Sequence, residues 1–263
     1  MLRLLQSDFY RLFKSKAFYI CNLVAVVLLA GGVFLNDWAS RIMAENPQST
    51  SMPLSTIKNG ISYGITTFSD GQVHLFISIF VAIFVTAEFV HGTMKNVVSK
   101  GFPKYQIYIS KIITMVAATF IMMFTIFIFV TIAATIVSGK FGVITGGFLV
   151  QILGMIGVEL LLHAALTALF VMVAMTIRNG AAVIAINIIG VNSILPMTFQ
   201  LIDYLFKNKT QFSFYTLQYN IVTYYQNLTP PAESIIRAII VSVVYFSVAT
   251  AIGIYAFKNT DVK

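Results

Sequence analysis

The chain has 263 residues, of which 58% are hydrophobic and 10% are charged, and its formal net charge is +8. Such a composition carries more apolar surface than one soluble core of this length would bury, which excludes an ordinary soluble protein and indicates a membrane protein. The charge does not indicate nucleic-acid binding, because the 17 basic residues are scattered between apolar runs. A single cysteine, Cys21, excludes a disulfide within the chain.

The first sixteen residues have the pattern of an amphipathic helix. Apolar side chains recur every three or four residues with polar ones opposite, as in helices that lie in a membrane surface. We therefore expect residues 1–16 to form an interfacial helix on the cytoplasmic side. The apolar face comprises Leu2, Leu5, Phe9, Leu12 and Phe13, and the polar face comprises Arg3, Gln6, Tyr10 and Lys14.

Six long apolar segments follow along the chain. A bilayer core of about 30 Å needs about 20 helical residues. The segments are continuously apolar rather than alternating, which favours helices over a β-barrel. The sequence thus predicts an all-α membrane protein with a six-helix transmembrane domain over residues 17–257 and a cytoplasmic tail at 258–263. The expected spans are residues 17–36, 72–90, 112–137, 148–177, 181–199 and 235–257.

The basic residues between these segments predict the orientation of the chain. If the N-terminus is cytoplasmic, eleven lysines and arginines fall in cytoplasmic segments and six fall outside. Positive residues are enriched on the cytoplasmic side of membrane proteins, so we expect both termini there. The outer loop 37–71 is expected to have no domain of its own. The outer segment 200–234 contains eight aromatic residues, which predicts short helices at the membrane interface.

Two ionisable residues, Glu159 and His163, lie inside the fourth apolar segment. At positions i and i+4 they share a helix face, and Glu159 lies about 17 Å along the helix from Phe148, near the bilayer centre. A charge there is costly, so the pair should face protein or water. It is either a polar contact in a translocation path or proton relay, or a hydrogen-bonded pair that joins two spans.

Several motifs of common catalytic chemistry are missing from the sequence. There is no phosphate-binding loop of the GxxxxGK[ST] type, so we do not expect this chain to hydrolyse nucleotide. HExxH and CxxC patterns are also absent. A membrane-embedded enzyme that uses Glu159 and His163 is one alternative to a transport function, and a non-transporting scaffold or sensor is another.

The segment that joins the second and third spans, EFVHGTMKNVVSKGFPKYQIYISK at 88–111, is basic and interrupted at Gly101–Phe102–Pro103. Its order of residues resembles the type-2 ABC (ATP-binding cassette) exporter permeases, which show E-x-x-x-G-T, then G-x-x-[RK], then a lysine at the start of the next helix. Arginine is more usual where Lys104 stands. The matching residues are Glu88, Gly92, Thr93, Gly101, Lys104 and Lys111.

The resemblance covers nearly the whole chain and implies a transport subunit that pairs with a second permease subunit. It implies that a separate ATPase docks on residues 94–104 and on the turn Arg178–Asn179–Gly180, and that this partner carries ATP and Mg while the present chain carries no cofactor. The alternative for the basic segment is an anchor on anionic lipid. The further candidate coupling residues are Lys95, Lys100, Phe102 and Pro103.

The stretch NGISYGITTFSDGQVHLFI, at residues 59–77, resembles small Gram-positive permeases of lantibiotic immunity and amphipathic-peptide export. This resemblance implies a multi-pass protein of the bacterial cytoplasmic membrane. It also implies an amphipathic substrate, either a lantibiotic-like antimicrobial peptide or a lipid-like compound, which is moved out of the cell or membrane. A homodimer and a heterodimer are both compatible with it.

Overall fold

A computed structural model describes residues 1–45, 57, 59–142, 146–206, 211–224 and 231–259, and every regular element in these ranges is helical. This confirms the predicted all-α class. The elements are α1 (Leu2–Lys14), α2 (Lys16–Glu45), α3 (Gly60–Thr66), η1 (Thr67–Ser69), α4 (Gly71–Val90), α5 (Thr93–Ser99), α6 (Lys104–Ser138), α7 (Gly146–Ile177), α8 (Gly180–Ala185), η2 (Ile186–Ile194), α9 (Leu195–Leu205), η3 (Phe212–Tyr215), α10 (Leu217–Tyr224) and α11 (Ala232–Asn259).

Within the described ranges, six helical segments are long and apolar enough to cross a membrane. They correspond to α2, α4, α6, α7, the continuous α8–η2–α9 and α11. Several extend beyond the expected spans: α6 begins at Lys104 rather than at residue 112, and α2 continues to Glu45 rather than to residue 36. Apolar runs indicate only the part of a helix that lies in hydrocarbon, whereas backbone hydrogen bonding continues into polar surroundings.

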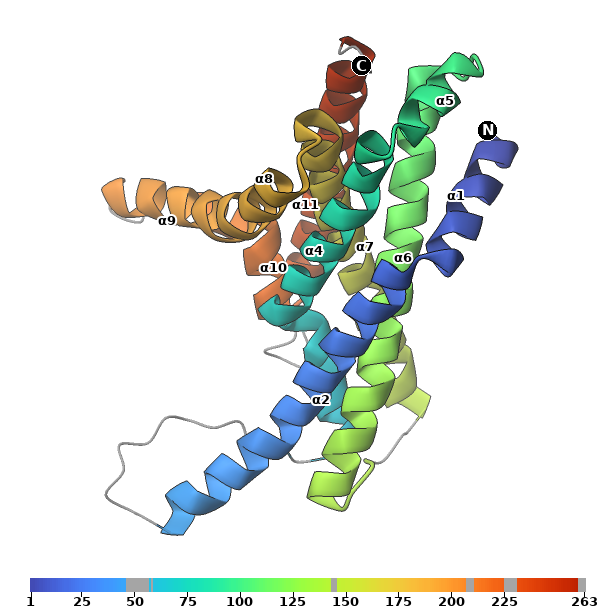
Figure 1. The fold of residues 1–263 in the computed structure, drawn as a ribbon. Helices are drawn as coiled ribbons and strands as arrows, with labels where there is room; N and C mark the ends of the chain where they lie inside the picture. Colours follow the sequence, from blue (N-terminus) through green and yellow to red (C-terminus); the bar gives the residue numbers. More distant parts are fainter. Residues whose placement is uncertain (46–56, 58, 143–145, 207–210, 225–230, 260–263) are drawn as a thin grey trace.

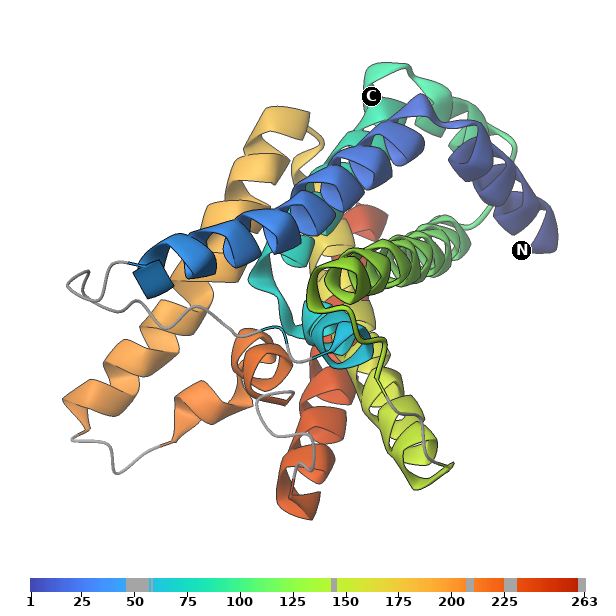
Figure 2. The same ribbon diagram turned by 90° about the horizontal axis from the view of Figure 1, so that it is seen from below.

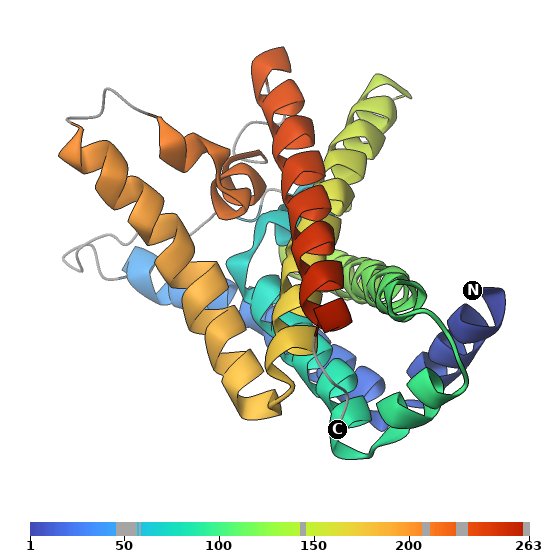
Figure 3. The same ribbon diagram turned by 90° about the horizontal axis from the view of Figure 1, so that it is seen from above.

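The bundle is built around α7, which packs against α4, α6 and α11, while α2 lies along α4 and α6 (Figure 1). Buried residues make up 61% of the apolar windows of α4 and α7. The corresponding share is 17% for α8–η2–α9, which projects away from the other spans (Figures 2 and 3). Most side chains of this segment therefore face surroundings other than the bundle.

Helix α3 is an element that the sequence did not predict, because it lies in the expected outer loop. It packs against α6 through Gly60 and Gly64, which let the two backbones approach closely. Its first turn is also held by backbone bonds, since Gly60 N donates to Lys140 O at 2.9 Å and Ile61 N donates to Phe141 O at 3.0 Å. Residues 46–56 and 58 of the same loop lie outside the described residues.

The two ends of the bundle differ in what they carry. Helices α1 and α5, the start of α6 and the end of α11 lie at one end, called here the α5 end; α3 and the end of α6 lie at the other, the α3 end (Figure 1). Helix α1 packs on α6, and its buried residues are Leu4, Asp8 and Leu12. Leu2 and Phe13 of the predicted apolar face are exposed, so they point away from the bundle.

Candidate functional site

At the α5 end, four charged side chains from three helices form a buried cluster. This charged cluster comprises Asp8 and Arg11 of α1, Glu88 of α4 and Lys111 of α6. Glu88 forms ion pairs with Arg11 and with Lys111, whose Nζ lies 2.5 Å from Glu88 Oε1, and Lys111 also pairs with Asp8. Asp8 accepts a further hydrogen bond, at 2.6 Å, from Ser110 Oγ. Two acids and two bases balance, so the cluster is neutral as a whole.

The burial of the cluster makes its pairing important. Glu88 is 2% exposed and Lys111 is 3% exposed. An ion taken out of water costs several kcal/mol unless partners compensate it, so loss of one member leaves a buried charge without compensation. Arg11 is half-buried and adds two contacts to α4: its Nη2 donates to Phe84 O at 3.3 Å, and its Cζ lies 4.1 Å above the Phe84 ring. The cluster thus joins α1 to α4 and α6.

The structure brings together Glu88 and Lys111, two of the residues singled out in the sequence, and adds Asp8 and Arg11. A sequence signal for Asp8 exists, since it is the sole acid in the first 36 residues and shares a helix face with Leu4 and Leu12. An acid on the buried face of a short helix needs a basic partner. Arg11 carries no comparable signal, because surface arginines are common on interfacial helices.

The connection from α4 to α6 is a helical hairpin with α5 between two glycine bends. Gly92 has φ 67° and Gly101 has φ 79°, both in the left-handed region that glycine adopts without strain. Thr93 Oγ1 donates to Glu88 O at 3.2 Å and so ties α5 to the last turn of α4. Pro103 immediately precedes the first residue of α6, where the absence of an N–H costs nothing.

Side chains of this hairpin point in different directions. Met94 is fully buried and Phe102 is half-buried, whereas Lys95 and Lys100 are exposed. Lys104 lies at the start of α6, and its Nζ donates to Lys258 O at 2.9 Å, which connects the hairpin to the end of α11. The hairpin therefore contacts the bundle through Met94 and Lys104 and presents two lysines outward.

The turn Arg178–Asn179–Gly180 lies against the same end of α4. Arg178 has φ 63°, and its Cζ lies 5.0 Å from the centre of the Phe89 ring. Asn179 Oδ1 accepts from Ala182 N at 3.2 Å and caps α8. At Gly180 a Cβ would lie 3.1 Å from Thr86 Oγ1, so the backbone passes close to α4. The predicted turn and the hairpin thus both contact the last turns of α4.

A second buried polar group lies between α4 and α7. His163 Nδ1 lies 2.9 Å from Glu159 O and 3.5 Å from Glu159 Oε2, and the His74 ring centre lies 5.1 Å from that of His163. Glu159 and His163 are fully buried, and His74 is 3% exposed. Sequence reasoning found the pair on α7 but missed His74, because it lies 89 residues from His163 and on another helix.

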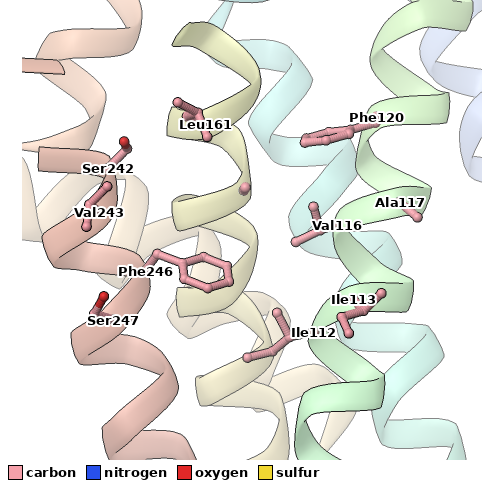
Figure 4. Close-up of a pocket in the computed structure, with 11 residues that line it drawn as sticks. Ile112, Ile113, Val116, Ala117, Phe120, Leu161, Ser242, Val243, Phe246 and Ser247 are labelled. Carbon is pink, nitrogen blue, oxygen red and sulfur yellow. The ribbon is translucent and has the colours of Figure 1, made fainter. Parts of the chain in front are cut away.

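The α7 face opposite this polar group lines an apolar cavity of about 510 Å³ (Figure 4). The cavity lies between α6, α7 and α11, and Glu159 and His163 do not line it. Two hydroxyl groups, of Ser242 and Ser247, accompany an otherwise apolar wall (Figure 4). Its lining includes Ile112, Val116 and Phe120 of α6, Leu161 of α7, and Val243 and Phe246 of α11.

A family model described as ABC-2 family transporter protein matches residues 4–194, which is well over half of the chain. The chain belongs to the ABC-2 transporter family. A comparison with curated proteins finds no significant match. The resemblance to type-2 ABC permeases is thereby confirmed, and the family supports a permease subunit that is a multi-pass membrane protein. The region matched includes the charged cluster, the hairpin and the 178–180 turn.

In this ABC-2 permease, the candidate coupling residues gather around one end of α4. Glu88 and Lys111 lie inside the charged cluster, Gly92 and Thr93 form the adjoining bend, and the turn contacts α4 through Phe89. Lys95 and Lys100 do not reach the cluster and face outward. In the described part of the permease, no group of three or more acidic, histidine or cysteine side chains could hold a metal ion.

Proposed function

We propose that this permease moves an amphipathic compound out of the cell or membrane and is driven by a separate ATPase bound at the α5 end. The observation that carries the proposal is the arrangement around the last two turns of α4. The basic hairpin, the 178–180 turn and the buried charged cluster all contact these two turns. A partner that bound the hairpin would therefore act directly on α4 and α6.

The mechanism follows from the stiffness of the connected parts. Helix α5 is one short element, joined to the last turn of α4 by the Thr93 bond to Glu88 O and to α6 through Pro103 with its fixed φ, so a shift imposed on it passes to the helices on either side. The charged cluster couples α4 and α6 to α1, and Lys104 couples α6 to the end of α11. Under the proposal, closure of the ATPase displaces α5 and the 178–180 turn together and switches the bundle between inward-open and outward-open states.

The remaining assignments are parts of the same proposal. A second permease subunit, identical or not, pairs with this one in the bacterial cytoplasmic membrane, both termini face the cytoplasm, and the partner ATPase carries ATP and Mg. The apolar cavity with its two serine hydroxyls supports an amphipathic substrate, either a lantibiotic-like antimicrobial peptide or a lipid-like compound. Glu159 and His163 would reach such a substrate only when α4 and α7 separate, because they are fully buried.

The test is a mild-detergent isolation of the tagged chain from its native host, with mass spectrometry of the proteins that co-purify. We expect a soluble ATPase with a phosphate-binding loop. Lys95→Glu with Lys100→Glu should abolish its recovery, because both lysines are exposed on the hairpin. Lys140→Glu is the control for charge reversal elsewhere, since Lys140 is also exposed but lies beside α3, where its backbone O accepts from Gly60 N.

Recovery of the ATPase by the double variant and the control alike would contradict docking on the hairpin. Isolation without any ATPase, under conditions that keep other membrane complexes intact, would contradict the proposal as a whole. Reconstituted vesicles then test transport itself, because a scaffold or sensor would bind the ATPase but move no labelled amphipathic peptide when ATP is supplied.

A further inference from the structure

A second cavity, of about 260 Å³, lies at the α5 end between α1, the start of α2 and the last turns of α4. Arg11, Lys14 and His91 contribute basic side chains to its lining. Ile83, Phe84 and Ala87 contribute apolar side chains. A cavity lined by both basic and apolar side chains matches an amphipathic anion.

The basic residues of the lining have donors available for a ligand. Lys14 and His91 are exposed, and Arg11 is half-buried. Ser15 also lines the cavity, as does Thr93, whose hydroxyl donates to Glu88 O. Such a set of donors matches the oxygens of a phosphate group, which accept several charge-assisted hydrogen bonds at once.

The acid in the cavity lining, Glu88, offsets the charge of Arg11 but not that of Lys14. Glu88 contributes to the wall, but its carboxylate is already paired with Arg11 and Lys111. Lys14 has no such partner among these acids, and its Nζ lies 5.2 Å from the centre of the Tyr10 ring. The positive charge of Lys14 is thus available to an incoming anion.

We propose that this cavity binds the phosphate headgroup of an anionic phospholipid. Arg11, Lys14 and His91 contact the phosphate, and Ile83 and Phe84 contact the upper part of an acyl chain. A soluble phosphate compound would leave the apolar wall unused. The adjoining surface also favours lipid, because Ile83 is 38% exposed and the nearby Tyr19 and Ile20 of α2 are 55% and 58% exposed in a segment long enough to span the bilayer.

Arg11 couples lipid binding to the charged cluster. Its guanidinium group pairs with Glu88 and also lines the cavity, so a phosphate competes with Glu88 for the same donors. Binding of an anionic lipid therefore biases the position of α1 relative to α4. This inference concerns the chain by itself, and its test requires neither an ATPase nor transport.

The test is native mass spectrometry of the purified full-length chain in a neutral detergent, with dioctanoyl phosphatidylglycerol as the probe and dioctanoyl phosphatidylcholine as the neutral comparison. We expect one phosphatidylglycerol to bind more tightly than phosphatidylcholine. Lys14→Gln with His91→Gln should weaken phosphatidylglycerol binding by about tenfold or more, because two donors to a charged group are lost. Lys14→Arg should retain binding.

Lys16→Gln with Lys95→Gln is the matched control. It also changes two polar residues at the same end of the bundle, but neither side chain lines the cavity. The control removes two lysine charges and the test variant removes one, so general attraction toward anionic lipid predicts a loss in the control at least as large as in the test variant. A specific site predicts less than a twofold loss in the control. All four positions are exposed, which keeps the folding of the variants comparable.

Equal losses in the two double variants, or a larger loss in the control, would overturn the proposal in favour of general surface attraction. Binding of phosphatidylcholine as tight as that of phosphatidylglycerol would overturn the anionic specificity. Glycerol 1-phosphate that competes as well as the short-chain lipid would identify a site for soluble phosphate compounds instead. Absence of a phosphatidylglycerol adduct on the unmodified chain would also overturn the proposal.

Discussion

Lys111 contacts both acids of the charged cluster. Its loss therefore leaves more buried charge without a partner than the loss of any other member. In Lys111→Gln, Asp8 loses its ion pair and Glu88 keeps only Arg11. We expect the free energy of unfolding to fall by about 3–5 kcal/mol, as is usual when one partner of a buried pair is removed. Denaturant unfolding of the purified protein in detergent measures this loss.

A double variant tests the electrostatic coupling between Lys111 and Asp8. Lys111→Gln combined with Asp8→Asn removes one buried base and one buried acid, so part of the lost stability should return. Lys95→Gln is the control for loss of a positive charge, because Lys95 is exposed and outside the cluster. If the double variant were as unstable as the sum of the two single variants, electrostatic coupling between Lys111 and Asp8 would be disproved.

Arg178 has a left-handed backbone conformation that is costly for a residue with a Cβ. Arg178→Gly and Arg178→Ala both remove the guanidinium group and its contact with Phe89, but only glycine also relieves the backbone strain. The glycine variant should therefore be more stable than the alanine variant by about 1–2 kcal/mol. Equal unfolding midpoints for the two variants would contradict a strained turn.

The sequence identified half of the charged cluster because those residues lie within one motif. Glu88 and Lys111 flank the same hairpin, so local order was enough to predict them. Asp8 is 103 residues from Lys111, and the periodicity of apolar residues cannot predict a contact between residues so far apart in the sequence. For the same reason Glu159 and His163, one helical turn apart, were predicted as a pair while His74 was not.

Helix α3 depends on the absence of side chains at its contact with α6. A Cβ at Gly64 would lie 3.0 Å from Thr131 Cβ and 3.2 Å from Phe127 Cε2. Gly64→Ala should therefore displace α3 and lower the free energy of unfolding by about 1–3 kcal/mol. Differential scanning fluorimetry in detergent would detect the change as a lower unfolding temperature.

Gly154→Ala is the control for this substitution. Gly154 lies inside α7 with nothing within 4 Å of a built Cβ, so alanine there adds helix propensity without a clash. Its unfolding temperature should match or exceed that of the unmodified protein. A Gly64→Ala protein as stable as Gly154→Ala would show that the close approach of α3 to α6 is not required.

The sequence predicted the membrane spans but not the π-helical stretch within one of them. Long apolar runs predicted the six spans because burial in lipid requires about 20 apolar residues in a row. The same signal could not resolve η2, a π-helical stretch of nine residues within the fifth span. Pro196 lies just after it and cannot donate to the carbonyl of Asn192, which favours a wider helical register there.

Side-chain bonds, rather than apolarity, order the aromatic segment before the last span. The Asp203 carboxylate accepts from Phe212 N and Ser213 N, each at 2.8 Å. Asn220 Nδ2 donates to Phe214 O at 2.8 Å, and Arg237 Nε donates to Asn220 Oδ1 at 3.3 Å. Aromatic composition predicted short helices here, and the structure has η3 and α10. Composition does not show which polar residues bond to one another, so it could not predict the hydrogen bonds that hold these helices.

The orientation of the whole molecule is testable with its single cysteine removed. In a Cys21→Ser background, Arg3→Cys places one exposed thiol at the α5 end, and Lys140→Cys places one at the α3 end. We expect a membrane-impermeant maleimide to label Lys140→Cys in intact cells and Arg3→Cys only after the cells are opened, because basic residues favour the cytoplasmic side. The reverse labelling would show that the α5 end faces outward.

The packing of the spans against one another was not predictable from their composition. All six are apolar on most faces, so no amphipathic stripe marks the side that faces α7. The separation of α8–η2–α9 from the other spans likewise has no counterpart in hydropathy, because its apolar character matches both lipid and protein surroundings.

Unequal helix lengths make bilayer thickness a variable for this protein. Helix α4 has 20 residues and is about 30 Å long, which equals the hydrocarbon thickness of a typical bilayer, whereas α6 has 35 residues and is about 52 Å long. In a thicker membrane α6 still spans, but the last turn of α4, with Glu88, is drawn into hydrocarbon. The acyl-chain length of the host lipids therefore acts on the buried ion pairs at the end of α4.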